Sequence, residues 1–282
     1  MRRLRHPGPE AAERAAVVAC RAFPLSLDLG AGESVNAALT GALARAGFAS
    51  GFARLDGLAV APMRYVIPAE APDASHVAWY SATYAPDGVV TIDKAGAIAG
   101  IRDDAPFIHC HGVWRGQDGP PRAGHLLPHE SFVAQGARVA AWGIAGAAFV
   151  ARDDAETNFT LFAAEPADGN VGEGGLPALA CTVRPNGDIS SMVEAACRAH
   201  GLGEADIHGI GSLAGVDFTD GRHVPSHATE VMIDSGRAGA GASLIDVALA
   251  DMDGAVHEGR LARGENPVCV TFELLAVARQ GG

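Results

Sequence analysis

A pattern of strand, turn, helix and strand occurs twice in this chain of 282 residues, and it limits the fold more than any other feature. In each copy an apolar strand segment leads through a turn to a helix, with Ser34 and Asp188 as the predicted N-caps. Residues 154 positions apart correspond: Val35 with Ile189, Leu39 with Val193, Gly47 with Gly201, and Gly57 with Gly211. Because a repeated unit implies a repeated fold, we expect two copies of one domain.

The repeat and the composition along the chain predict four segments. Residues 1–22 form an N-terminal extension, in which Glu10 to Arg21 is Ala-rich and predicts a short helix. Residues 23–165 form the first domain. Residues 166–177 are Gly-rich, acidic and without periodicity, which is typical of a linker. Residues 178–282 form the second, degenerate domain.

The overall composition indicates a globular protein. Hydrophobic residues make up 48% of the chain and charged residues 19%, while 36 glycines and 16 prolines favour short strands and many turns. The net charge of −12 argues against non-specific binding to phosphates. Five scattered cysteines without a C-x-x-C pair, together with no expected signal peptide or membrane-spanning segment, favour a cytoplasmic location. These cysteines are Cys20, Cys110, Cys181, Cys197 and Cys269.

The stretch from Pro106 to Leu127 predicts a hairpin that carries three histidines. Alternate strand residues point to the same face, so His109 and His111 can direct their imidazoles to one point while Cys110 points away. The turn-forming residues 117–121 can return the chain so that His125 joins that face. Three imidazoles with an open fourth position suit a divalent metal, most of all Zn²⁺, although a lone strand histidine is more often simply packed or solvent-facing.

Neighbouring residues offer further interpretations of this site. Glu130 could serve as a fourth ligand or as a base, but a surface glutamate in a loop is the preferred interpretation. Asp103 and Asp104 could orient a ligand imidazole, or they could form an acidic turn. Cys110 would be a ligand only if the strand assignment were wrong. Catalytic residues are therefore not assigned.

The second copy lacks the histidines. Aligning the copies puts Asp246 and Ala248 in the places of His109 and His111, and Arg260 in the place of His125. The fold therefore does not need the triad, which favours a functional interpretation of it. Four histidines of this half show no ligand spacing and are expected to be surface or ordinary core residues: His208, His223, His227 and His257.

The sequence P-F-I-H-C-H, followed by a turn and G-H-L-L, resembles the PPC domain, a domain shared by plants and prokaryotes that lies beside AT-hooks in plants. The resemblance covers both halves and is stronger in the first. It implies an α+β fold in which a mainly antiparallel, twisted sheet packs against a helix, and it implies homo-oligomers, usually trimers. It also implies that the matching histidines, His109, His111 and His125, are metal ligands.

Three functions remain open at this stage. The first is a metal-binding tandem PPC-like protein of unassigned molecular activity. The second is a metal-dependent enzyme that acts on a small molecule bound at the metal. The third is a DNA-binding regulator, which the plant members of the family imply. The N-terminal run Arg2-Arg3-Leu4-Arg5 has no Arg-Gly-Arg core of an AT-hook, and the acidic charge balance also disfavours nucleic acid.

Overall fold

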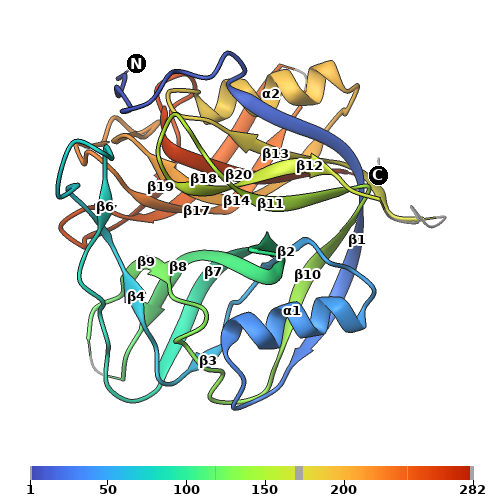
Figure 1. Ribbon diagram of the computed structural model, residues 1–282, viewed down its shortest axis with the longest axis vertical. Helices are drawn as coiled ribbons and strands as arrows, with labels where there is room; N and C mark the ends of the chain where they lie inside the picture. The colour runs from blue at the N-terminus through green and yellow to red at the C-terminus, as the bar shows by residue number, and fades with distance from the viewer. Residues whose placement is uncertain (1, 118, 169–173, 240, 280–282) are drawn as a thin grey trace.

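The computed structural model describes residues 2–117, 119–168, 174–239 and 241–279. This part of the chain is mainly β, with two helices beside one large sheet (Figure 1). Its ladders are antiparallel apart from a single parallel pairing of Val150 with Ile101. The predicted antiparallel sheet is confirmed, but the class is mainly β rather than α+β, because each half has only one segment with helical spacing.

We call residues up to 168 the first half and residues from 174 the second half. The first half contains helix α1 (Val35–Arg45) and strands β1 (Ala15–Leu29), β2 (Gly51–Arg54), β3 (Ala59–Val60), β4 (Tyr65–Val66), β5 (Pro68–Ala69), β6 (Trp79–Tyr80), β7 (Val90–Arg102), β8 (Ala105–Arg115), β9 (Arg122–Leu126), β10 (Ala137–Ala145), β11 (Ala147–Asp153) and β12 (Thr160–Pro166). The second half contains helix α2 (Ile189–Ala199) and strands β13 (Leu176–Val183), β14 (Ala205–Leu213), β15 (Val216–Asp217), β16 (His223–Val224), β17 (Glu230–Ala238), β18 (Ser243–Ala250), β19 (Val256–Arg260) and β20 (Val268–Ala278).

The two halves of the large sheet have the same arrangement of strands when each is followed outward from the middle of the sheet. The strand order is β19-β18-β17-β14-β20-β13-β1-β10-β2-β7-β8-β9-β4. From the central pair β13 and β1, the second half continues with β20, β14, β17, β18 and β19, and the first half with β10, β2, β7, β8, β9 and β4, so that in each half the strand after the helix comes second. In Figure 1 the second half lies above together with β11 and β12 of the first half, α1 and β7 to β10 lie below, and β1 runs from the upper part to the lower.

Strand β1 corrects the expectation for the N-terminal segment. The predicted helix from Glu10 to Arg21 is wrong, because residues from Ala15 onward are extended. Residues 15–22 pair with β13 of the second half, and residues 21–29 pair with β10 of the first. The β-branched Val17 and Val18 suit a strand, and the ladder satisfies their backbone groups. The predicted boundary at residue 22 thus falls inside one continuous strand.

The two helices predicted after Ser34 and Asp188 are confirmed together with their N-caps. The Ser34 hydroxyl accepts a hydrogen bond from the Ala37 N–H at 3.1 Å, and the Asp188 carboxylate accepts one from Ser191 at 2.7 Å. Gly47 and Gly201, just after the helices, have positive φ angles of 89° and 62°, which are typical of glycine. The helices are of equal length and begin 154 residues apart, as the repeat predicts.

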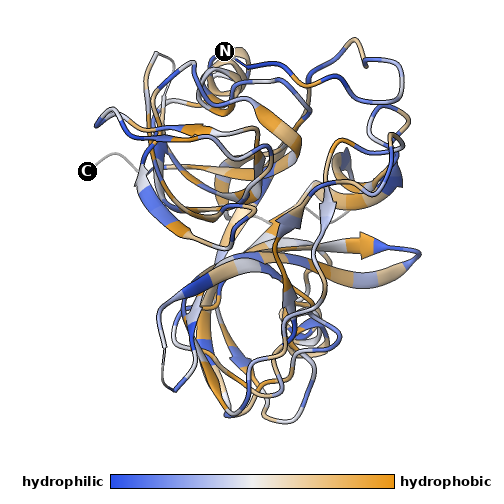
Figure 2. Ribbon diagram, turned by 90° about the vertical axis from the view of Figure 1, so that its left-hand side faces the viewer, coloured by the Kyte–Doolittle hydropathy of each residue, from blue (hydrophilic) through white to orange (hydrophobic). Residues whose placement is uncertain are grey.

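The two halves share part of their hydrophobic core. The larger core cluster packs under α1 and also includes Ile210, Met232 and Leu275 from the second half, whereas a second cluster packs under α2. Figure 2 shows hydrophobic residues along the strands of both halves. Within the described ranges no helix has the length and apolar character needed to cross a membrane. The predicted linker, residues 166–177, overlaps the last residue of β12 and the first two residues of β13, and its residues 169–173 are outside the described part.

Candidate metal centre

The three predicted histidines lie together on one face of a hairpin. Strands β8 and β9 are antiparallel, and their register places His111 directly opposite His125. His109 lies two residues before His111, on the same face. Cys110 points to the opposite face, where it is fully buried in the hydrophobic core and burial raises the pKa of its thiol to about 12. The structure therefore excludes Cys110 as a fourth ligand.

A close approach of strand β4 holds His125 in this position. Val66 of β4 pairs with His125, and a Cβ atom on Gly124 would lie 2.4 Å from the Val66 carbonyl oxygen. Glycine is thus needed before His125, which explains the Gly-His order of the motif. The Tyr80 ring lies on the other side of His125, with 5.3 Å between the ring centroids.

The ring nitrogens of the triad converge on His111. Its Nε2 atom lies 2.8 Å from Nε2 of His109 and 3.2 Å from Nδ1 of His125. All three ligand atoms lie within 4.8 Å of one another. Tetrahedral zinc with Zn–N bonds of 2.0–2.1 Å would separate its nitrogen ligands by about 3.3 Å, so shifts of about half an ångström would accommodate the ion.

In two of these rings, the nitrogen that points away from the cluster contacts a group of the second half. The Nδ1–H of His111 donates to the Val231 carbonyl oxygen at 3.1 Å, which leaves its Nε2 lone pair free to face the cluster. Nδ1 of His109 lies 3.0 Å from Oε2 of Glu273, which is fully buried. When Glu273 is ionised it accepts the Nδ1 proton, and the Nε2 lone pair of His109 also faces inward. Such outer partners typically orient metal-bound histidines.

A second carboxylate lies beside the cluster. Oε2 of Glu230, at the start of β17, is 2.8 Å from Nε2 of His111. Its side chain is 9% exposed and lines the adjacent cavity. Nε2 of His111 carries at most one proton, yet it faces a carboxylate and two imidazole nitrogens at hydrogen-bonding distance. A cation in their midst would satisfy all four groups together.

Burial and neighbouring charges keep two of the three rings neutral. Burial lowers the pKa of His109 to about 3 and lowers the pKa of His125 well below its usual value, and repulsion from His111 contributes to both. Burial alone would lower the pKa of His111, but the Glu230 carboxylate outweighs it and raises that pKa. A proton bound in the cluster is therefore held most readily by His111, whose Nε2 lone pair faces the cluster when that proton is absent. Since metals bind neutral imidazole, a bound ion would replace this proton.

The two glutamates have opposite shifts. Burial raises the pKa of Glu273 to about 8. Burial alone would also raise the pKa of Glu230, but attraction to His111 outweighs it and lowers that pKa. A cation at the cluster would favour the ionised form of Glu273, because it would strengthen the Nδ1–H donor of His109.

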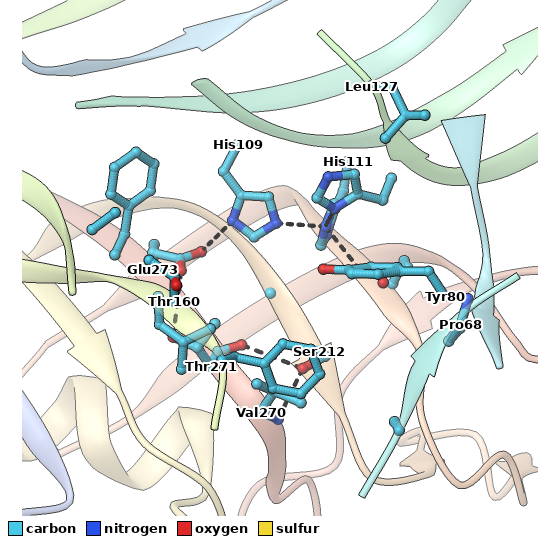
Figure 3. Close-up of a pocket in the computed structure, with 18 of the residues that line it drawn as sticks. Pro68, Tyr80, His109, His111, Leu127, Thr160, Ser212, Val270, Thr271 and Glu273 are labelled. Carbon is cyan, nitrogen blue, oxygen red and sulfur yellow. Dashed lines mark hydrogen bonds and ion pairs between the residues drawn. The ribbon is translucent and has the colours of Figure 1, made fainter. Parts of the chain in front are cut away.

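A cavity of about 350 Å³ opens beside the triad, between the two halves. Figure 3 shows His109 and His111 on one side of it, Tyr80 on another, and Ser212 and Thr271 across from the histidines. The Thr271 hydroxyl donates to Oε1 of Glu273 at 3.3 Å. The cluster thus faces an open space rather than solid core, which leaves room for a ligand.

The other residues considered from the sequence lie elsewhere. Glu130 is exposed and lines the cavity, but no contact joins it to the triad. Asp103 and Asp104 form the exposed turn between β7 and β8, with positive φ angles of 51° and 58°, so the acidic-turn interpretation holds. Within the described ranges, the only metal-ligand group found is the triad, and none of the second-half histidines belongs to such a group.

Sequence analysis missed Glu230 and Glu273 because both belong to the other half of the chain. Glu273 had a signal: it is the one charged residue within the apolar strand β20, and a buried carboxyl requires a partner. Glu230 had none. The register of β18 and β19 also corrects the alignment of the two halves. Asp246 lies opposite Arg260, as His111 lies opposite His125, so Asp246 corresponds to His111 and not to His109.

Comparisons with known proteins give weak similarities. No known protein family matches the chain, and neither does any curated protein. Among solved structures, a PPC protein from Pyrococcus horikoshii has 14% identity and a TM-score of 0.41, covering 52% of this chain and 94% of its own. A metal-containing protein from Archaeoglobus fulgidus has 20% identity and a TM-score of 0.38, covering 57% of this chain and 99% of its own. A hypothetical protein from Salmonella cholerae-suis has 20% identity and a TM-score of 0.32, covering 38% and 83%.

Proposed function

We propose that this chain binds one divalent metal ion, zinc, through His109, His111 and His125. One observation carries the proposal: Nε2 of His111 lies within 3.2 Å of two other imidazole nitrogens and a carboxylate oxygen. Imidazole lone pairs that face each other, with His111 buried and His109 and His125 half-buried, repel unless a cation lies between them. The outer partners of His109 and His111 add support, because they direct the inner lone pairs to one point.

Zinc fits this ligand set better than magnesium or calcium do. Imidazole nitrogens suit zinc and other late transition metals, whereas magnesium and calcium prefer oxygen ligands. Three histidines leave a fourth position for a ligand from the cavity or for Glu230. Imidazole also binds copper and nickel, and elemental analysis distinguishes these ions from zinc.

We also propose that the two halves are degenerate copies of one PPC-like unit. The mirrored strand order, the equal helices 154 residues apart and the matched caps support a duplication. Only the first copy kept the triad. The second copy has an ion pair, Asp246 with Arg260 at 2.9 Å, where the first has His111 and His125. Its contribution to the site is the two carboxylates and the Val231 carbonyl.

Metal analysis of the purified protein tests the first proposal. We expect one zinc ion per chain in the wild type and loss of metal in His111→Ala and His125→Ala. His129→Ala is the matched control, because His129 lines the same cavity without belonging to the triad, and it should keep its metal. Wild-type protein that takes up no stoichiometric metal from a zinc-containing buffer would refute the proposal.

A second candidate function is metal-dependent chemistry on a small molecule, and the cavity beside the triad favours it. A bound zinc ion would supply Lewis acidity there. Glu230, ionised and next to His111, is placed to accept a proton from a molecule in the cavity. Metal-loaded protein should then act on members of a panel of nitrophenyl esters, and Glu230→Gln should lose turnover while keeping metal. Equal activity of wild type and Glu230→Gln would rule out this role.

A further inference from the structure

The cavity beside the triad has an aromatic wall. Its aromatic side chains come from three separate parts of the first half: Trp79 and Tyr80 of β6, Phe107 of β8, and Phe159 and Phe162 at the start of β12. Phe107 and Phe162 lie 6.1 Å apart between centroids, and Trp79 stacks on Phe159 at 5.5 Å with 26° between the rings. Rings from distant segments therefore form one surface.

This surface is only partly covered by the protein itself. Trp79 is 39% exposed and Tyr80 is 40% exposed, and both are among the few large hydrophobic side chains so exposed in the described part of the chain. Large exposed apolar groups that line a cavity typically mark a binding site, because a ligand can remove them from water.

The aromatic wall reaches the triad directly. The Tyr80 ring lies 5.3 Å from the His125 ring. A molecule with a polar head at the triad would therefore place its body against aromatic side chains. Three charged groups of the cavity already have partners: Glu230 and Glu273 contact histidines, and the Arg102 guanidinium lies over the Phe107 ring and near Asp103.

We propose that the cavity binds a small molecule with a planar aromatic body and an oxygen-donor head directed at the triad. The inference of an oxygen-donor head depends on the proposed metal function, whereas the inference of an aromatic body depends only on the aromatic wall of the cavity. A flat ring suits a wall of rings because offset and edge-to-face contacts stabilise aromatic pairs beyond the area they bury. The volume of about 350 Å³ limits the occupant to a small molecule.

Two hydroxamates test this preference, because benzohydroxamate and acetohydroxamate share a metal-binding head and differ in the ring. Binding to zinc-loaded protein is measured by calorimetry and by tryptophan emission, since Trp79 lines the cavity whereas Trp114 and Trp142 do not. Burial of a phenyl ring predicts that benzohydroxamate binds about 10- to 100-fold more tightly. Trp79→Ala should lose most of this preference. Tyr84→Ala is the matched control, because Tyr84 is exposed on the same segment but stacks on Tyr65 outside the cavity.

Chelator-treated protein separates this inference from the metal proposal. Removing the metal should weaken both hydroxamates and leave the preference for the ring. If the ring preference persists but neither affinity depends on metal, the metal proposal fails and the aromatic pocket stands. Equal affinities for the two hydroxamates, with metal and without it, would overturn the inference.

Discussion

The imidazole of His109 and the carboxyl of Glu273 face each other across the junction of the two halves, with 3.0 Å between Nδ1 and Oε2. His109 belongs to the half that carries the triad, whereas Glu273 belongs to the half without it. The second half is therefore part of the site, and several consequences of this arrangement can be measured.

Replacing Glu273 should weaken metal binding without removing a ligand. Glu273→Gln keeps the shape of the side chain but removes the negative charge behind His109. Loss of such an outer partner typically lowers metal affinity about 10- to 100-fold. Competition with a chromogenic zinc chelator measures the change. Glu194→Gln is the control, because Glu194 is also buried but pairs with Arg263 away from the triad. Equal affinities of wild type and Glu273→Gln would show that the carboxyl does not act through His109.

The protein should lose its metal as the pH is lowered, because protons compete with the metal for His111. Glu230 raises the pKa of His111, so protonation of this ring begins at a higher pH than for an ordinary histidine. The low pKa values of His109 and His125 make those rings weak competitors. In Glu230→Gln this negative charge is gone. Because a divalent ion is attracted to the carboxylate more strongly than the single proton that it replaces, the midpoint of metal release should move to higher pH. Equilibrium dialysis between about pH 5 and pH 8 measures it; a midpoint that moves downward would contradict the account.

One ion should bind per chain at every protein concentration. Both carboxylates that contact the triad come from the same chain, so the site needs no second copy. Association of the chain can be followed in the same experiment by light scattering. Zinc content per chain should stay constant on dilution even where oligomers dissociate. Loss of metal together with dissociation would place a ligand on a neighbouring chain.

The attachment of the N-terminal segment should be sensitive to acid. Arg14 makes two hydrogen bonds of 2.9 Å to Glu156, whose side chain is 3% exposed. Burial alone would raise the pKa of Glu156, but Arg14 outweighs it and lowers that pKa. A carboxylate whose pKa is lowered by folding stabilises the folded state at pH values above 4.5, its pKa in the unfolded chain. This stabilisation is lost as the pH falls through the pKa of the folded state.

Glu156→Gln removes the charge that Arg14 contacts. It should lower the free energy of unfolding by about 1.5–3 kcal/mol at pH 7 and by less near pH 3. Urea denaturation at both pH values measures the difference. Glu165→Gln is the control: its pair with Arg152 is largely exposed, so less than about 1 kcal/mol is expected. A cost for Glu156→Gln that does not shrink in acid would exclude the ion pair as its source.

The sequence predicted the local features of this protein well. Ser34 and Asp188 cap helices because their side chains accept backbone N–H groups of the first turn, a property set within four residues. His109 and His111 share a face because strand geometry fixes the direction of alternate side chains. The turn then brought His125 opposite His111, as the hairpin predicted.

Long-range features were not predictable in the same way. The Ala-rich segment before Phe23 has good helix formers, yet it is a strand because β13 pairs with it. Glu230 reaches His111 only through the packing of the two halves, which no spacing in the sequence encodes. Aligning the halves by sequence placed Asp246 two residues away from its position in the ladder.

The most direct test of the central claim is a crystal structure of the zinc-loaded protein with anomalous data on both sides of the zinc edge. The account predicts one strong anomalous peak about 2.0–2.1 Å from Nε2 of His109, Nε2 of His111 and Nδ1 of His125. Zinc that binds elsewhere, or a triad without an anomalous peak in protein that carries stoichiometric zinc, would contradict it.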